Sequence, residues 1–134
     1  MKSNQEKILT NTQIRIITKI NKTESLNKVE SSIKNMIRKD IKITRKNDYL
    51  IVEDDLRLLE NIKNKINKKE YNALCHNILE SNREDSTTRF FINKQCAYND
   101  SFHMSDMDLS QLGDIEVEIH SDNLDDAIKW ISDD

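Results

Sequence analysis

Two segments near opposite ends of the chain alternate between apolar and polar side chains, and this alternation constrains the fold more than any other feature. Residues 13–20 read QIRIITKI, with an isoleucine or a threonine at every second position from Ile14. Residues 114–119 read DIEVEI and alternate without interruption. Successive side chains of a strand point to opposite faces, so each segment is predicted to be a strand with one buried face. The chain therefore needs a sheet whose core face is covered by other elements.

Apolar residues at intervals of three to four predict amphipathic helices in the rest of the chain. Thr23 is the expected N-cap of the first helix, Asp54 or Asp55 of the second, and Ser121 or Asp122 of the last. The second and third helices are expected as a pair, or as one kinked helix. The helices are expected at about 24–39, 55–66, 71–78 and 122–131.

Further strands are expected between these helices. A polar turn at 46–48 joins the apolar runs 41–43 and 49–52, which predicts a β-hairpin. Residues 87–93 read TTRFFIN and are rich in β-branched and aromatic residues, which favours another strand, and 102–104 is a candidate for a short fifth one.

The order of these elements predicts an α+β fold. Strands and helices do not alternate strictly, which favours a mixed, mainly antiparallel sheet packed by helices over a parallel one. Gly113, the only glycine, marks the turn into the last strand. We expect an N-terminal tail at 1–10 and a single domain over 11–134.

The sequence also indicates where the protein is located and whether its cysteines are oxidised. The first ten residues, MKSNQEKILT, lack the apolar core of a secretory signal, and no run approaches the length of a membrane span. We therefore expect a cytoplasmic protein with no membrane partner. The only two cysteines, Cys75 and Cys96, have no zinc-ribbon or redox spacing, and we expect both to be reduced thiols.

The residue types that support catalysis or metal binding do not form a recognisable pattern. Cys75 and His76 are adjacent on an expected helix, while Cys96, His103 and His120 lie on other elements, so a metal site or a Cys-His nucleophile pair has little support. One glycine is too few for a phosphate-binding loop. We expect no enzyme activity, no small-molecule substrate, no cofactor and no metal.

Charge is divided between the two halves of the chain. Residues 1–69 carry 17 lysines and arginines against 9 aspartates and glutamates, whereas residues 70–134 carry 4 against 15. Such asymmetry is a hint of a nucleic-acid surface. The alternative is that codon bias in an AT-rich genome supplies lysines that only solvate the surface.

Residues 91–98, FINKQCAY, resemble the strand-end signature Asn-Lys-Gln-Ala-Ala of an archaeal family, the uncharacterised protein family 0201 of the UPF series. That family consists of predicted RNA-binding proteins. Three shorter segments agree in order: KTES at 22–25, SQLGDI at 110–115 and Trp130-Ile131. The resemblance spans roughly residues 11–132. This sequence departs from the family pattern in having Cys96 for alanine, Gln111 for proline and no glycine before the strand at 87–93.

The resemblance implies a fold similar to the ribosomal protein that holds 5S ribosomal RNA, a homodimer, and a nucleic-acid role. Asn93, Lys94 and Gln95 then offer donors to phosphates or base edges. The alternative is that the two amides satisfy the backbone of their own loop while Lys94 lies in solvent.

Three functional hypotheses follow. The first is a non-catalytic protein that binds structured RNA, ribosomal RNA among the candidates, with Tyr49 and Tyr98 available for base stacking. The second is a homodimeric interaction module with no nucleic-acid role, in which acidic and basic halves meet. The third is a metal-dependent nuclease. Under the first, the contacting residues are predicted to be Arg15, Lys19, Lys42, Arg45, Lys46, Arg89, Asn93, Lys94 and Gln95.

Overall fold

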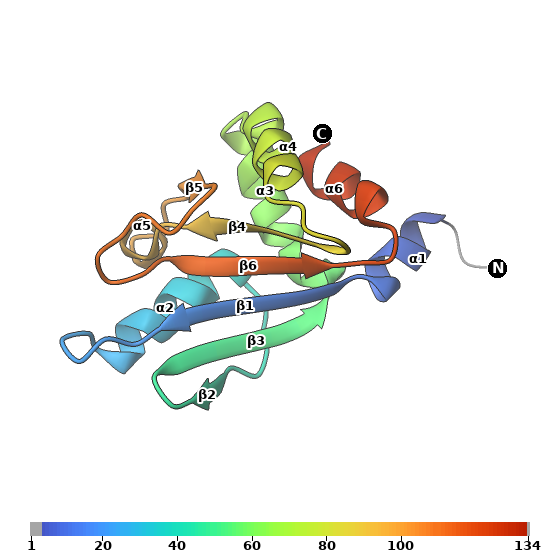
Figure 1. Cartoon of the computed structure of the whole chain (residues 1–134). Helices are drawn as coiled ribbons and strands as arrows, with labels where there is room; N and C mark the ends of the chain where they lie inside the picture. The colour runs from blue at the N-terminus through green and yellow to red at the C-terminus, as the bar shows by residue number, and fades with distance from the viewer. Residues whose placement is uncertain (1–3, 134) are drawn as a thin grey trace.

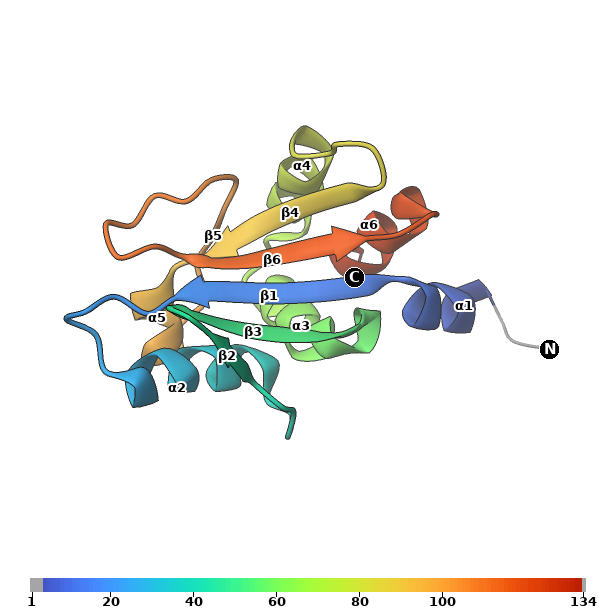
Figure 2. The same cartoon turned by 60° about the horizontal axis from the view of Figure 1, so that its bottom comes forward.

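The computed structural model describes residues 4–133 and contains one antiparallel sheet with helices on one of its faces (Figures 1 and 2). The strand order is β2-β3-β1-β6-β4-β5. The strands are β1 Gln13–Lys19, β2 Thr44–Lys46, β3 Tyr49–Asp55, β4 Thr87–Ile92, β5 Met104–Ser105 and β6 Ile115–His120. The helices are α1 Asn4–Asn11, α2 Leu26–Ile37, the short 3₁₀ helix η1 Leu56–Leu59, α3 Glu60–Lys68, α4 Asn72–Ser81, α5 Lys94–Tyr98 and α6 Leu124–Ser132.

The two alternating segments form the centre of the sheet. β1 and β6 pair antiparallel, with Ile16 opposite Val117. Their buried residues line one face, against which the apolar stripes of the helices pack. The prediction of an α+β fold with a mainly antiparallel sheet is confirmed.

The other face of the sheet is not covered by any helix among the described residues (Figure 2). The side chains that point to it, such as Arg15, Ile17 and Phe91, are half-buried by their own neighbours on adjacent strands. We call this surface the open face. Two rows of register partners across the four central strands define it. One row is Glu53, Arg15, Glu118 and Arg89, and the other is Ile51, Ile17, Glu116 and Phe91.

Several boundaries differ from the expectations. The hairpin begins at Thr44, because Ile41 and Ile43 pack against the core ahead of β2 instead of joining its ladder. Glu70, in the left-handed conformation at φ 57°, separates α3 from α4, so the two are distinct helices. The segment expected as an N-terminal tail holds α1, whose Ile8 is buried.

The caps also differ in part. Asp55 caps η1 as expected, accepting a hydrogen bond from the backbone N–H of Arg57 at 3.0 Å. The first expected helix has Ser25 at its N-cap instead of Thr23. The last helix has Asn123 at that position, while the hydroxyl of Ser121 accepts a hydrogen bond from the backbone N–H of Asn123 at 3.1 Å.

Both cysteines are free thiols. Burial raises the pKa of Cys75 to about 12, although Lys63 acts in the opposite direction. No helix within residues 4–133 has both the length and the apolar character that crossing a membrane demands.

Candidate nucleic-acid interface

A hollow lies where β1 ends and the β2–β3 hairpin turns back. Its volume is about 680 Å³, and Lys19, Lys22 and Arg45 line it together with Asp48. The backbone N–H of Ile20 donates to the carbonyl of Asp48 at 2.6 Å, which fixes the hairpin turn to the end of β1. Two cations at and just after the end of β1 and one on β2 are thereby held around one concave surface, which we call the basic hollow.

The cations of the basic hollow are not neutralised by ion pairs. Lys19, Lys22 and Arg45 have no carboxylate within ion-pair distance among the described residues, and Arg45 Nε donates only to the carbonyl of Asn47, at 3.2 Å. Lys46 on β2 and Lys42, two residues before β2, are both exposed. The five cations outnumber Asp48, the carboxylate of the hollow that lies in no ion pair within residues 4–133, so this part of the surface carries a net positive charge.

Tyr49 lies at the border of the hollow, between two lysines. The register places it directly opposite Lys46 on β2 and directly opposite Lys19 on β1. Directly opposite residues share a face of the sheet, so the three side chains form a row of cation, aromatic ring and cation. The ring of Tyr49 is 42% exposed, which leaves it accessible for stacking.

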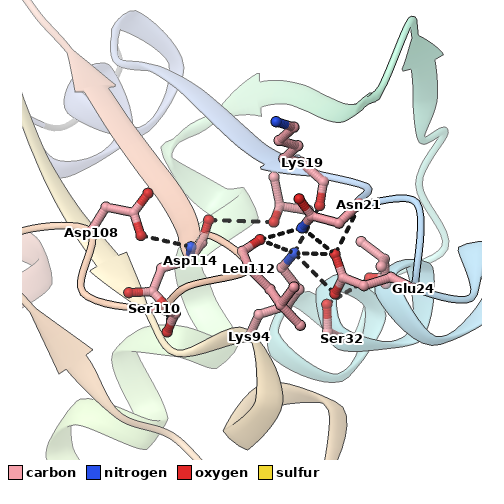
Figure 3. Close-up of polar contacts among 11 residues, drawn as sticks. Lys19, Asn21, Glu24, Ser32, Lys94, Asp108, Ser110, Leu112 and Asp114 are labelled. Atoms are coloured by element: carbon pink, nitrogen blue, oxygen red, sulfur yellow. Dashed lines mark hydrogen bonds and ion pairs between the residues drawn. The ribbon is translucent and has the colours of Figure 1, made fainter.

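Lys94 is placed differently from the expectation that it reaches RNA or solvent. Its side chain is 7% exposed, and its Nζ donates to Glu24 at 2.9 and 3.2 Å, to the carbonyl of Lys19 at 2.8 Å and to that of Leu112 at 2.9 Å (Figure 3). These partners come from β1, the β1–α2 loop and the loop before β6. We call this arrangement the Lys94 clamp.

The Lys94 clamp neutralises Glu24, one of the two carboxylates that line the basic hollow, the other being Asp48. Burial alone would raise the pKa of Glu24, but hydrogen bonds from Lys94 and Asn21 outweigh it and hold that pKa below its ordinary value of 4.5. The carboxylate is therefore ionised and already neutralised by Lys94. It subtracts little from the charge of the three cations around the hollow.

The two amides beside Lys94 differ in role: Asn93 satisfies its own loop, whereas the side chain of Gln95 is left available to a ligand. Asn93 caps α5, its Oδ1 accepting from the backbone N–H of Cys96 at 2.8 Å, and its amide donates to Ser110 at 3.4 Å. The alternative of a side chain that satisfies its own loop therefore describes Asn93. Gln95 is exposed on α5, and its side chain forms no hydrogen bond within residues 4–133.

Arg15 and Arg89 lie on the open face and do not line the basic hollow, although Arg15 lines a neighbouring groove with Lys19 and Tyr49. Each arginine is directly opposite Glu118 of β6, and Arg15 is also opposite Glu53 of β3. Arg89 approaches Glu118 to 4.0 Å. The expected patch that joins Arg15 and Arg89 to the hairpin cations is thus interrupted by carboxylates, and Lys94 is not part of it.

The structure adds Lys22 to the candidate residues. Lys22 follows the strand that ends in Lys19, so a cation in the loop directly after a basic strand end was the signal available in the sequence. Within residues 4–133, no three histidine, cysteine, aspartate or glutamate side chains are grouped to hold a metal ion.

Comparison with known proteins identifies the family. A family model described as RNA binding matches residues 13–121. The UPF0201 protein of Methanothermobacter thermautotrophicus is 29% identical over 122 residues, which are 91% of this chain and 92% of that protein. The crystal structure of the UPF0201 protein from Methanococcus jannaschii is 25% identical with a TM-score of 0.73, over 90% of this chain and 92% of the other. An uncharacterized UPF0201 protein, 21% identical, shares the fold with a TM-score of 0.76 over 91% and 94% of the chains. Because the family model spans most of the sequence and the relatives match over about nine-tenths of both chains, this chain belongs to the UPF0201 family.

Proposed function

We propose that this protein is a non-catalytic RNA-binding protein that contacts phosphates through the basic hollow and the hairpin beside it. The observation that carries the proposal is the set of three unpaired cations around one concave surface, with Lys42 and Lys46 adjacent to it. Lysine and arginine side chains bind RNA by displacing counterions from phosphates, which requires that they are not already neutralised by the protein. The family model described as RNA binding supports the same class of partner.

The row of Lys46, Tyr49 and Lys19 suits an unpaired nucleotide. An exposed aromatic ring stacks on any base, and a cation on each side can hold the flanking phosphates. The open-face arginines are less suited to RNA, because Glu53 and Glu118 lie directly beside them. Structured RNA with a loop or bulge therefore fits this surface better than a duplex.

The test measures binding of a structured ribosomal RNA fragment and of duplex DNA across a salt series. With five phosphate contacts, the logarithm of the association constant should fall with the logarithm of salt with a slope of about −3.5 to −4.5. The triple variant K42E/R45E/K46E should bind the RNA about 100-fold more weakly at low salt. Its slope of log association constant against log salt should be shallower than that of the wild type by about two to three, out of about four.

The matched control is K68E/K69E/K129E, which makes the same change of charge at three exposed lysines of the helical side. It should retain most of the affinity. If RNA binding is absent at low salt, or if both triple variants weaken it equally, the proposed site is wrong. Cleavage of the RNA in the presence of Mg²⁺ or Mn²⁺ would contradict the non-catalytic part of the proposal.

A further inference from the structure

The Lys94 clamp lies between two hollows of the surface. Glu24 and Leu112 line the basic hollow, and both also line a smaller cavity of about 270 Å³ between the start of α2 and α5. Lys94 lines the smaller cavity but not the basic hollow. Glu24 is therefore part of the surface that an anion in the basic hollow would meet, while its counter-ion lies behind it.

The ion pair between Glu24 and Lys94 is short and nearly buried. Nζ of Lys94 donates to Oε1 of Glu24 at 2.9 Å and to Oε2 at 3.2 Å, and the two side chains are 7% and 13% exposed respectively (Figure 3). Asn21 donates to Oε1 as well, at 3.0 Å from its backbone N–H and at 2.6 Å from its side-chain amide. Little water reaches the pair, so a change in its charge is weakly screened at the neighbouring surface.

Lys94 is the cation that neutralises Glu24. Lys28 also lines the smaller cavity with Glu24, but its Nζ lies over the ring of Tyr98, 5.2 Å from the ring centroid. Within residues 4–133, the ion pair with Lys94 is the one that Glu24 forms. Loss of Lys94 would therefore place an uncompensated carboxylate beside the cations of the basic hollow.

The charge of the basic hollow depends on this pair. The three cations that line the hollow and Lys94 oppose Glu24 and Asp48, which leaves a local net charge of +2. We infer that the Glu24–Lys94 pair sets the anion affinity of the basic hollow, because Lys94 cancels the charge of Glu24 there. Where the anion is RNA, the inference rests on the proposed function. It assigns the buried ion pair a role in binding that is separate from its role in stability.

Substitutions at the pair change the local charge in steps of one. E24Q raises it to +3, because glutamine keeps an acceptor for Asn21 while the ammonium of Lys94 loses its counter-ion. K94M lowers it to +1, and K94M/E24Q returns it to +2. The affinity for an anion should follow the same order: E24Q binds most tightly, the wild type and K94M/E24Q bind alike, and K94M binds most weakly.

A purely structural role of the pair predicts a different order. Lys94 also donates to the carbonyls of Lys19 and Leu112, which belong to residues that line the basic hollow. If Lys94 acted only by holding these segments, K94M and K94M/E24Q should both weaken binding, and E24Q should not tighten it. Stability cannot produce the charge-dependent order either, because both E24Q and K94M/E24Q lose the ion pair and should be less stable than the wild type.

The test measures the Kd of a structured ribosomal RNA fragment and of inorganic tripolyphosphate by isothermal titration calorimetry at low salt. E24Q should bind each ligand about three- to tenfold more tightly than the wild type, and K94M about three- to tenfold more weakly. K94M/E24Q should lie within about twofold of the wild type. A double variant as weak as K94M, or an unchanged Kd in E24Q for both ligands, overturns the inference.

The matched control is E84Q, which removes the same charge from an exposed glutamate at the opposite end of the sheet. Glu84 bridges to Thr87, which pairs with His120, whose other partner is Gln13 at the start of β1. Its Kd should lie within about twofold of the wild type, since the distance exceeds the range of unscreened interaction. An equal gain in E84Q and E24Q would overturn the inference, because total charge and not the pair would then set the affinity.

The two ligands separate this inference from the proposed function. The predicted order for tripolyphosphate without any binding of RNA supports the inference and overturns the RNA-binding function. RNA binding that is the same in E24Q and the wild type supports the function and overturns the inference, and a wild type that binds neither ligand overturns both. Circular dichroism melts should show that the variants are folded. If K94M is not folded, E24Q against E84Q decides the outcome, because E24Q retains both carbonyl partners of Lys94.

Discussion

The Lys94 clamp makes a quantitative prediction, because one nearly buried ammonium joins four segments. In the variant K94M, Glu24 keeps its hydrogen bonds from Asn21, at 3.0 Å from the backbone and 2.6 Å from the amide, but loses its counter-charge. The carbonyl of Leu112 retains a donor in the side chain of Asn21, whereas the carbonyl of Lys19 loses the ammonium. The dominant cost is therefore an uncompensated carboxylate whose side chain is 13% exposed.

Breaking a buried ion pair by removing one partner typically costs about 3–5 kcal/mol. For a chain of this size, each kcal/mol lowers Tm by roughly 3–4 °C, so K94M should melt about 10–20 °C below the wild type. The measurement is urea unfolding followed by circular dichroism, with calorimetry for Tm. The double variant K94M/E24Q, which removes the orphaned charge but keeps an acceptor for Asn21, should recover about half of the loss.

The control is K22M, which removes an exposed loop lysine with no ion pair among the described residues. It should change the free energy of unfolding by less than about 0.5 kcal/mol. If K94M lowered the free energy of unfolding by less than about 1 kcal/mol, the reasoning would be refuted, because the ammonium would then contribute little to the stability of the clamp. Failure of K94M/E24Q to recover any stability would show that the orphaned charge is not the cause.

Two further predictions concern titratable groups. Because the folded state holds the pKa of Glu24 below the ordinary 4.5, the ionised Glu24 contributes its full stabilisation above pH 4.5. That stabilisation is lost as the pH falls through the lower pKa of the folded state. Below about pH 4.5 the free energy of unfolding should therefore change less steeply with pH in E24Q than in the wild type. An unchanged slope in urea unfolding between neutral and acidic pH would contradict this. The buried Cys75, with its pKa raised to about 12, should resist a thiol reagent in the native protein, whereas Cys96, half-buried at the surface, should react, and mass mapping of the labelled residue distinguishes the two.

Much of the fold could be predicted from periodicity, because each long element has a strong period of its own. β1 and β6 alternate with a period of two, and α2 and α6 carry apolar stripes, so their existence and type were confirmed. The short elements were less predictable. α5 covers five residues around the Asn-Lys-Gln motif, too few for a helical period to show, and its N-cap bond from Asn93 depends on the loop geometry.

The candidate site was predictable in composition but not in arrangement. The cations of the hairpin and of the end of β1 were named from the sequence, and the structure brings Lys19 and Arg45 together with Lys22. Lys94 was misplaced, because a lysine at a strand end is ordinarily solvated and nothing local marks Glu24, 70 positions earlier, as its partner. Arg15 and Arg89 were expected to extend the basic patch, but the register that places Glu118 between them is a long-range property of the sheet.

The Lys94 clamp also bears on how long the native state persists once formed. Lys94 bonds to Lys19 and Glu24, which lie 75 and 70 positions away along the chain, so its contacts can form only after long loops have closed. Interactions that are completed after the transition state slow unfolding and leave the folding rate nearly unchanged. We therefore expect K94M to unfold faster than the wild type in stopped-flow denaturant jumps, while its folding rate stays nearly unchanged.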